Sequence, residues 1–528
     1  MQRTLSPLTA RTTPSLVRAA ARRFGERVAI EDGDVRLSFG ELEAAILRAA
    51  RACLAAGVRP GERVAIWAPN VHEWIVAALG LQSAGGVLVP INTRWKGAEA
   101  GYVLRKCRAR LLFTLGEFLG TQYPAQLAGE DLPALETIVC LRGEAVGTLA
   151  WSDFLARGEA VSEAEAQARA AAVTPEALSD LLFTSGTTGK PKGVMTTHAQ
   201  NLRAFAAWSE VVGLREGDRY LVVNPFFHSF GYKAGWLASL LRGASVLPQL
   251  VFDVPGVLGR VGRERVSVLP GPPTLYQSIL AHPDRARYDL SSLRLAVTGA
   301  AAIPVELIHR MRSELGFETI ITGYGLTECC GIVSMCRFDD DPETIATTSG
   351  RAIPDTEVRC VDREGKETPR GEPGEVVVRG YHVMQGYFED EDETRKTIDA
   401  AGWLHTGDVA VMDERGYLRI TDRIKDMFIT GGFNCYPAEI ENLLFGLEGV
   451  AQVAVIGVPD ERLGEVGKAF VVARPGATLT PASVIAWCRE QMANYKVPRA
   501  VEIVDALPLN ASGKVMKFEL RARSTRQP

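Results

Sequence analysis

Patterns of cysteine and histidine that bind metals or form disulfide frameworks are missing from this 528-residue sequence. Its nine cysteines include no C-x-x-C pair, and it has only seven histidines. The sequence therefore predicts neither a zinc site nor a disulfide framework, and a reduced cytoplasm is the compartment that fits such cysteines. The formal net charge of -4 supplies no basic surface, which argues against a role in nucleic-acid binding.

A long hydrophobic run is also absent. The most apolar stretch, residues 74–91, is interrupted by Gln82, Ser83 and two adjacent glycines, so it predicts a buried helix and a strand rather than a membrane span. The first 24 residues are rich in arginine, serine and threonine and contain no acid, which is the composition of an organellar transit peptide. Part of the same stretch also reads as a capped surface helix that runs into a strand, and both interpretations stay open.

Apolar runs of strand length alternate with helix-like patterns over much of the chain. These runs lie at residues 63–70, 85–91, 110–114, 220–225, 266–270, 293–299 and 319–325. Strands that alternate with helices predict parallel α/β sheets. From about residue 350 short β segments with turns predict a barrel-like or meander-like unit, and a small α+β unit follows. The predicted fold is α/β, with domains at residues 1–424 and 425–528.

A loop rich in glycine, threonine and lysine, "TSGTTGKPKG" at 184–193, follows an apolar run. Glycines let a backbone approach an anion closely, while hydroxyls and ammonium groups supply donors and positive charge. A P-loop is excluded by spacing, because only two residues separate Gly186 from Gly189 and Pro191 follows Lys190. The segment therefore predicts a phosphate-binding loop of another kind, with a surface turn as the alternative.

Six motifs follow one another along the chain. They are "LLFTSGTTGKPKGVMTTH" (181–198), "YGLTE" (324–328), "HTGD" (405–408), "TDRIKD" (421–426), "GGFNCYPAEIE" (431–441) and "LPLNASGK" (507–514). In this order they resemble the adenylate-forming superfamily of acyl-CoA synthetases, adenylation domains and luciferases, over essentially the whole chain. The resemblance implies that a carboxylate attacks the α-phosphate of ATP and that a thiol then displaces AMP from the acyl-adenylate. It implies ATP, Mg²⁺ and coenzyme A as cofactors.

The resemblance also assigns roles to single residues. Lys514 bridges the substrate carboxylate and the α-phosphate, Glu328 holds Mg²⁺ and Thr327 donates to the α-phosphate. His228 gates the acyl pocket, and Lys425 is the hinge of a mobile C-terminal domain. The implied ATP-binding residues are Thr184, Ser185, Gly186, Thr187, Thr188, Gly189, Lys190, Lys192, Gly299, Ala300, Ala301, Tyr324, Asp408 and Arg423. The implied CoA-binding residues are Gly431, Gly432 and Phe433, and the acyl-pocket residues are Phe227, Tyr232, Lys233, Gly325 and Gly331. Ordinary surface or structural roles are the alternatives for the lysines, Glu328 and His228.

The segment "NPFFHSFGYKAG" (224–235) bears on the choice of acid. Amino-acid-activating relatives place an aspartate there to pair with the substrate ammonium, and this segment has none, which favours an acid without an amino group. With "VLPGPPTLYQSIL" (268–280) and "MCRFDDDPETIATTSGR" (335–351) the segment is similar to actinobacterial ligases of steroid C/D-ring breakdown, which activate a methylhexahydroindanedione propanoate. A medium- or long-chain fatty-acid ligase and a stand-alone adenylation enzyme that loads a carrier protein are the alternatives.

The thiol and the remaining partners follow from the same resemblance. No carrier-protein module follows residue 520, so free CoA is the expected thiol, and the sequence leaves a homodimer open. Lys233 has two interpretations: it snorkels from a helix into water, or its ammonium donates to a ring ketone at the far end of the acid.

Overall fold

The computed structural model describes residues 9–184, 191–299, 303–423, 426–430, 433–492, 494–510 and 515–524, and only the backbone of residues 422, 423, 429, 433 and 434. The predicted site residues Ser185–Lys190, Ala300, Ala301, Lys425, Gly431, Gly432 and Lys514 lie outside these ranges. Within the ranges, no helix combines the length and the apolar character that a membrane crossing needs.

The first sheet has eight strands in the order β18-β9-β8-β4-β3-β5-β6-β7. They are β3 (Arg63–Trp67), β4 (Val87–Pro90), β5 (Leu111–Thr114), β6 (Thr137–Cys140), β7 (Leu149–Ala150), β8 (Leu178–Thr184), β9 (Lys192–Thr197) and β18 (Gly386–Tyr387). Strands β3 to β7 run parallel, while β8 and β9 form an antiparallel hairpin. Helix α3 (His72–Ser83) connects β3 to β4 and is buried along nearly its whole length. The predicted helix and strand at 74–91 are confirmed.

Helices α2 and α3 pack closely against each other beside this sheet. A Cβ at Gly80 of α3 would lie 2.5 Å from the Cβ of Ala49 in α2 (Phe39–Ala55), so only glycine lets the two helices approach this far. Helix α1 (Thr13–Phe24) packs against both α2 and α3. Thr12 closes a capping box at its start, and the chain then enters β1, so the predicted capped helix is confirmed.

The second α/β region contains two groups of strands joined through one residue. One group has the order β10-β11-β1-β2 and the other β12-β13-β14-β15. Their bounds are β1 (Val28–Asp32), β2 (Val35–Ser38), β10 (Arg219–Val222), β11 (Ser245–Pro248), β12 (Leu295–Gly299), β13 (Thr319–Tyr324), β14 (Ser334–Met335) and β15 (Arg351–Ala352). Val268 bridges Tyr220 of β10 and Leu295 of β12 in parallel. The carboxyl ends of β11, β10, β12 and β13 therefore face one edge, where ligands of such sheets bind.

The predicted strand at 266–270 is wrong in length. Val268 forms the bridge that remains of it, although the N–H groups of Leu269 and Gly271 still donate to the carbonyls of Leu295 and Val297. Because proline has no N–H, Pro270 cannot continue the ladder on the side of β10.

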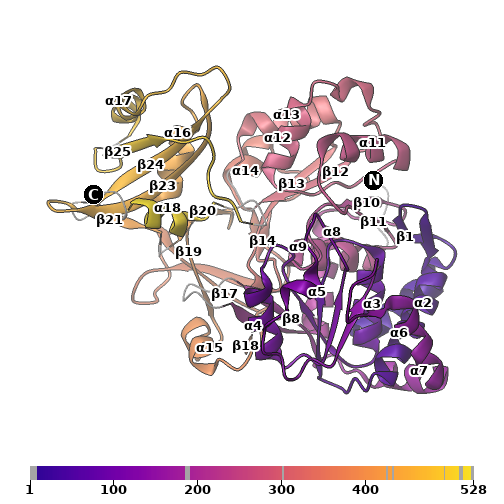
Figure 1. The fold of residues 1–528 in the computed structure, drawn as a ribbon. Coiled ribbons are helices and arrows are strands. Elements are labelled where there is room, and N and C mark those ends of the chain that lie inside the picture. The colour runs from indigo at the N-terminus through magenta and orange to yellow at the C-terminus, as the bar shows by residue number, and fades with distance from the viewer. Residues whose placement is uncertain are drawn as a thin grey trace.

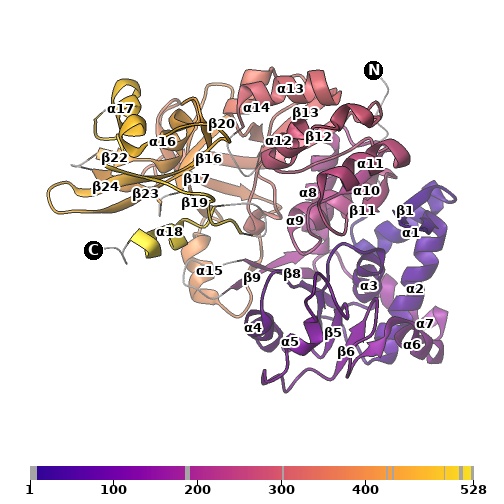
Figure 2. The same cartoon turned by 45° about the horizontal axis from the view of Figure 1, so that its top comes forward.

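Helices flank the second region. They are α8 (His198–Val211), α9 (Ser229–Gly231), a π-helix (Tyr232–Leu237), α10 (Ala238–Arg242), α11 (Val254–Glu264), α12 (Pro273–Ala281), α13 (Val305–Leu315) and α14 (Pro342–Thr347). Figure 1 and Figure 2 show α11 to α13 together on one side of the strands β10 to β13.

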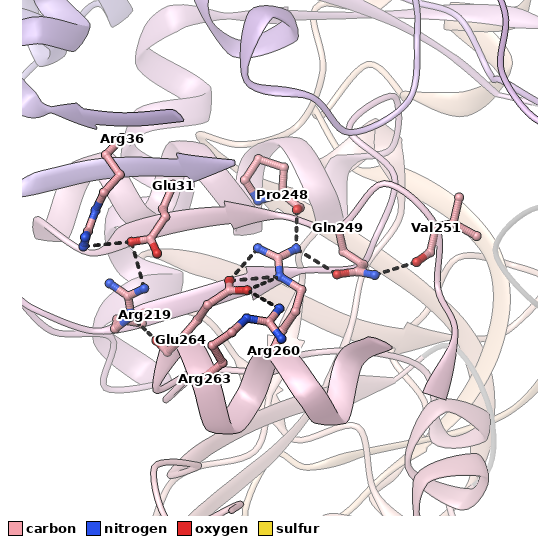
Figure 3. A network of polar contacts seen from close by, with 9 residues as sticks. All are labelled: Glu31, Arg36, Arg219, Pro248, Gln249, Val251, Arg260, Arg263 and Glu264. Atoms are coloured by element: carbon pink, nitrogen blue, oxygen red, sulfur yellow. Dashed lines mark hydrogen bonds and ion pairs between the residues drawn. The ribbon is translucent and has the colours of Figure 1, made fainter. Parts of the chain in front are cut away.

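A polar network ties α11 to the end of β11 (Figure 3). Arg260 donates to both oxygens of Glu264 at 2.7–2.9 Å, to the carbonyl of Pro248 at 2.6 Å and to Gln249 at 2.8 Å. Gln249 in turn donates to the carbonyl of Val251 at 2.6 Å. The loop that carries the exposed side chains Leu250, Val251 and Phe252 is therefore held by side-chain bonds at the carboxyl edge.

The predicted meander after residue 350 is confirmed. The strands β16 (Thr356–Val361), β17 (Pro373–Gly380), β19 (Leu404–Met412) and β20 (Leu418–Arg423) pair antiparallel in this order. Their core includes Cys360, Val378 and Leu418.

The C-terminal unit has a sheet and a core of its own. Its strands are β21 (Phe428–Thr430), β22 (Phe433–Cys435), β23 (Val450–Asp460), β24 (Gly464–Ala473) and β25 (Ala500–Ile503). Its helices are α16 (Pro437–Leu444), α17 (Pro481–Gln491) and α18 (Lys517–Ser524). Phe428, Ile440 and Val484 belong to the core that these elements enclose. Figure 1 shows this unit, in orange and yellow, beside the rest of the molecule.

All nine cysteines are free, and all nine side chains are buried. They are spread over the first sheet, the second region, the meander and the C-terminal unit. The structure brings none of the nine together as a disulfide.

Candidate active site

The residues predicted to contact adenine lie where β12 and β13 end. Gly299 and Gly323 are register partners in these parallel strands, and a Cβ at Gly299 would lie 2.6 Å from the carbonyl oxygen of Gly323. A side chain at residue 299 would therefore push the strands apart. Tyr324, the last residue of β13, follows directly at this edge.

Tyr324 and Asp408 are in contact, as a shared nucleoside site requires. The Tyr324 hydroxyl donates to Asp408 Oδ2 at 2.6 Å, and Asp408 is 6% exposed. Burial, and then the Asp408 carboxylate, raise the pKa of Tyr324 far above its ordinary value, so the phenol remains a donor. Asp408 is also the register partner of Arg423 across β19 and β20, which brings the backbones of both predicted ribose-binding residues together.

The described ends of the predicted phosphate-binding segment belong to the β8–β9 hairpin. Thr184 ends β8, Lys192 begins β9, and the two residues pair across the hairpin. The Lys192 ammonium lies 2.5 Å from Glu393 Oε2 and 5.1 Å from the centre of the Tyr387 ring. The Lys192 ammonium, and then that of Lys396, lower the pKa of Glu393 to about 2, so Glu393 stays ionised at neutral pH.

Glu328 joins the same cluster. The Tyr387 hydroxyl donates to Glu328 Oε1 at 2.9 Å, and burial, followed by the charge of Glu328, raises the pKa of Tyr387. The carbonyl of Glu328 accepts from the Met384 N–H at 2.8 Å. Thr327, half-buried, precedes Glu328 in the same short turn. Glu328, Tyr387, Lys192 and Glu393 thus form one connected group next to the predicted phosphate loop.

Sequence reasoning missed Tyr387 and Glu393. Both lie in "GYFEDEDET" (386–394), a run in which the acids read as a solvated helix start. The signal was Tyr387, an aromatic residue that leads into the acidic run and pairs with β9 through β18.

His228 begins the helical segment on the acyl side. It is the N-cap of α9, its Nδ1 accepts from the Phe230 N–H at 3.2 Å, and its imidazole is exposed. Phe227 beside it is half-buried. The structure therefore leaves His228 Nε2 free to face a ligand, while Nδ1 caps the helix.

Two glycines bring the Glu328 turn against α9. A Cβ at Gly325 would lie 2.3 Å from the carbonyl oxygen of Gly331, and a Cβ at Gly331 would lie 2.7 Å from Ser229 Oγ. Gly331 also has φ +103°, a conformation that side chains avoid. Both predicted acyl-pocket glycines are thus required for the approach of the two segments.

Tyr232 and Lys233 lie in the interior. Tyr232 stacks on Trp236 at 4.6 Å, and its hydroxyl accepts from Gln82 at 3.0 Å. Lys233 is 0% exposed, and its ammonium lies 3.1 Å from Asp180 Oδ1. The interpretation that Lys233 snorkels into water is wrong, because the buried carboxylate of Asp180 holds it inside. Donation to a ring ketone stays a prediction.

Asp180 was missed by sequence reasoning. It is the one acid in the otherwise apolar strand "LSDLLFT" (178–184), and Lys233 is the one charge in "FGYKAGWL" (230–237). A single charge in each of two buried segments, with opposite signs, is a pattern from which the ion pair could have been predicted.

The C-terminal unit contacts the N-terminal part of the chain through the last motif. Arg94, which follows β4, donates to the carbonyl of Asn510 at 3.3 Å. Asn510 belongs to "LPLNASGK", so this contact places the described part of that motif next to the N-terminal sheet.

A second cluster of potential ligand atoms lies elsewhere. Among the described residues, Asp32, His72 and Glu73 have ligand atoms within 4.8 Å of one another. Arg142 donates to Glu73 at 2.7 and 2.8 Å and also to Asp32. Burial would raise the pKa of Asp32, but bonds from His72 and Arg142 outweigh it and lower the pKa to about 2. A guanidinium already compensates these carboxylates, so the cluster gives no support for a metal.

Comparisons with known proteins show the family of the chain. The model of the AMP-binding enzyme family matches residues 17–388, and that of the AMP-binding enzyme C-terminal domain matches residues 439–514. A 7a-methyl-1,5-dioxo-octahydro-1H-inden-4-yl-propanoyl:CoA ligase from Rhodococcus jostii is 55% identical over 516 residues, 97% of this chain and 98% of that one. A ligase of the same name from Mycobacterium tuberculosis is 51% identical over 97% of this chain and 98% of its own.

A solved structure extends the comparison to the fold. An anthranilate CoA ligase in complex with anthranoyl-AMP superposes with a TM-score of 0.87 at 31% identity, covering 98% of both chains. The predicted mixed α/β fold, with a large N-terminal part and a small α+β C-terminal part, is therefore confirmed, and so are ATP and CoA as its cofactors. The chain belongs to the AMP-binding enzyme family, the adenylate-forming superfamily, as an AMP-forming acyl-CoA ligase.

Proposed function

We propose that this enzyme activates methylhexahydroindanedione propanoate, a bicyclic propanoic acid with two ketones, and transfers it to CoA. The observation that carries the proposal is the 55% identity, over 97% of the chain, to a ligase named for this acyl group. The relative at 51% identity carries the same name. The pairing of Asp180 with Lys233 also supports an acid without an amino group, because this carboxylate is not available to a substrate ammonium.

The first half of the proposed reaction uses the N-terminal site. Asp408 accepts from the ribose hydroxyls, assisted by Arg423, and adenine lies against Tyr324 and residues 299–301. Thr184, Lys192 and the loop between them donate to the β- and γ-phosphates. Supporting this assignment, Tyr324 and Asp408 are bonded at 2.6 Å, and Thr184 and Lys192 close the hairpin together.

Glu328 is the residue that would hold Mg²⁺. Mg²⁺ prefers hard oxygen ligands shared with phosphates, and Glu328 offers a half-buried carboxylate whose Oε1 is oriented by Tyr387. When bound, the ion would offset the negative charge of the phosphates of ATP. Thr327 donates to the α-phosphate from the same turn.

The second half of the proposed reaction uses the C-terminal domain, residues 425–528, which follows the N-terminal domain of residues 1–424. Lys514 bridges the carboxylate and the α-phosphate during adenylation. Rotation about Lys425 then presents the loop of Gly431, Gly432 and Phe433 to the pantetheine of CoA. Phe227, His228, Tyr232, Lys233, Gly325 and Gly331 border the acyl group. The contact of Arg94 with Asn510 supports the adenylation pose.

The cellular setting of the proposed reaction is the cytoplasm. The nine free, buried cysteines support a reducing compartment. Sedimentation velocity of the purified enzyme distinguishes a monomer from the homodimer that the sequence leaves open.

The test is a pyrophosphate-release screen over fatty, aryl and polycyclic propanoic acids, with mass spectrometry of the CoA products. We expect the bicyclic diketone to give the highest kcat/KM and its CoA thioester as product. Lys514→Ala is the matched control, and it should lower adenylation roughly hundred- to thousandfold, as expected for one lost transition-state donor.

Two results contradict the proposal. Preference for a medium- or long-chain fatty acid makes the enzyme a fatty-acid ligase. Faster transfer to a phosphopantetheinylated carrier protein than to CoA makes it an adenylation enzyme that loads a carrier.

A further inference from the structure

A buried ion pair joins strand β8 to the π-helix. Asp180 Oδ1 lies 3.1 Å from Lys233 Nζ, and both side chains are 0% exposed. Moving two charges out of water costs about as much as their attraction returns, so an apolar pair of similar volume is often equally stable. Stability alone therefore does not explain why charges occupy these two positions.

Neighbouring side chains hydrogen-bond both members of the pair. Asp180 Oδ1 accepts from Thr196 at 2.7 Å, and Lys233 Nζ donates to the same hydroxyl at 3.1 Å. Asp180 Oδ2 accepts from Asn201 at 2.6 Å and from Tyr232 at 3.3 Å. These partners come from β9, α8 and the π-helix, so one carboxylate fixes four elements relative to each other.

Each of these elements leads to a part of the candidate active site. Asp180 precedes Thr184 by four residues on β8, and Thr196 follows Lys192 by four residues on β9. Lys233 follows His228 by five residues. The ion pair therefore lies at the base of both the phosphate hairpin and the segment that begins at His228.

The backbone around Lys233 has an unusual conformation. Residues Tyr232–Leu237 form a π-helix, which is rare and is often found at functional sites. The N–H groups of Gly231 and Tyr232 donate to the carbonyl of His228 at 3.0 and 2.9 Å. Any shift of Lys233 is thus transmitted to His228 through a short, hydrogen-bonded segment.

We propose that Asp180 and Lys233 are positioning residues that hold the acyl side of the site at a fixed distance from the β8–β9 hairpin. This inference rests on the proposed two-step reaction. In-line attack needs the carboxylate of the acid about 3–3.5 Å from the α-phosphate. The pair sets this distance through the four elements that its hydrogen bonds join.

The test compares Asp180→Asn, Lys233→Met and the double variant carrying both. Each single change leaves an uncompensated buried group, so both single variants should melt at lower temperature than the wild type. The double variant restores charge balance, because the oxygen of the introduced amide can accept from Asn201 and Tyr232 while its nitrogen donates to Thr196. We expect it to melt above both single variants but to release pyrophosphate with a kcat lower by roughly tenfold or more, at an unchanged KM for ATP.

The matched control is a largely buried ion pair at the amino ends of β10 and β12, in the second α/β region. Arg294 donates to Asp218 Oδ1 at 2.8 Å, and these residues precede β12 and β10. The double variant Asp218→Asn, Arg294→Met should keep the wild-type kcat in its folded fraction.

A wild-type kcat in the double variant at 180 and 233 overturns the proposal, because the pair would then serve folding alone. Thr196→Val removes the hydroxyl that bonds both members of the pair and keeps both charges. It tests the proposal even if the double variant does not fold. A lower kcat at unchanged KM for ATP is expected, and a wild-type kcat overturns the proposal here too. Rates are compared with any acid that the enzyme turns over, so a wrong substrate leaves this test intact.

Discussion

At the scale of single residues, Asp408 offers the sharpest test of nucleotide binding. Its carboxylate is 6% exposed and accepts from Tyr324, so it is oriented before ATP arrives. Hydrogen bonds to a charged group are worth about 1.5–3 kcal/mol. Asp408→Ala should therefore raise the KM for ATP roughly ten- to hundredfold, as measured by pyrophosphate release at saturating acid.

Tyr324→Phe is the control for this prediction. It removes the phenol that orients Asp408 but keeps the ring and the carboxylate, so the KM for ATP should rise less. An unaltered ATP dependence in Asp408→Ala would remove the residue from the nucleotide site.

At the scale of elements, the turn before β15 depends on a glycine. A Cβ at Gly350 would lie 1.7 Å from the carbonyl carbon of Met335 in β14, and Gly350 has φ +72°. Gly350→Ala should destabilise the protein by more than about 2 kcal/mol, because backbone and not a flexible side chain would have to move. Gly365→Ala is the control, since Gly365 has φ +80° with nothing within 4 Å and should cost about 1–2 kcal/mol. Equal melting temperatures of the two variants would contradict the prediction.

The loop after β4 is the second element with a test. Arg94 donates to the carbonyl of Asn510, ahead of Lys514 in the sequence. Arg94→Ala should lower adenylation several-fold, consistent with the loss of about 1 kcal/mol from one hydrogen bond, while CoA attack on supplied acyl-adenylate keeps its rate. Arg105→Ala, which removes a contact to Glu130, is the control. Equal loss in both half-reactions would show that Arg94 does not act through the adenylation pose.

At the scale of the whole molecule, two buried histidines contribute to the loss of stability in acid. Burial lowers the pKa of His198 from 6.5 to about 4, and burial together with Arg203 lowers that of His382 to about 4. Below pH 6.5 the unfolded chain takes up protons at these residues while the folded protein does not. Stability is therefore complete above pH 6.5 and is lost as the pH falls towards 4, by about 1.4 kcal/mol per pH unit for each histidine.

Thermal melting between pH 7 and 5 checks this prediction. His198→Gln keeps an acceptor for Thr13 and should flatten the decrease of the melting temperature. His309→Gln, at an exposed position, should leave it unchanged. Identical slopes in all three proteins would contradict the role of His198.

Sequence patterns predicted the architecture well, because period and motif order are local properties. They predicted the strand alternation, the meander and the C-terminal unit, and the resemblance brought Tyr324 and Asp408 to one site. They predicted a strand at 266–270 that is too long, since the apolar pattern does not show that Pro270 shortens the pairing around Val268. They also missed Asp180 opposite Lys233, because a partner 53 residues away is a property of packing.

Because all nine cysteines are buried, the native thiols of the folded enzyme should react only slowly with thiol-directed labels. One cysteine introduced on the exposed surface of α17 and another on α13 would carry a fluorophore pair without prior removal of native thiols. Energy transfer between them would then test for the proposed rotation of the C-terminal domain during turnover. In the same sample, the rate at which the native thiols react would report how often the protein unfolds locally or globally.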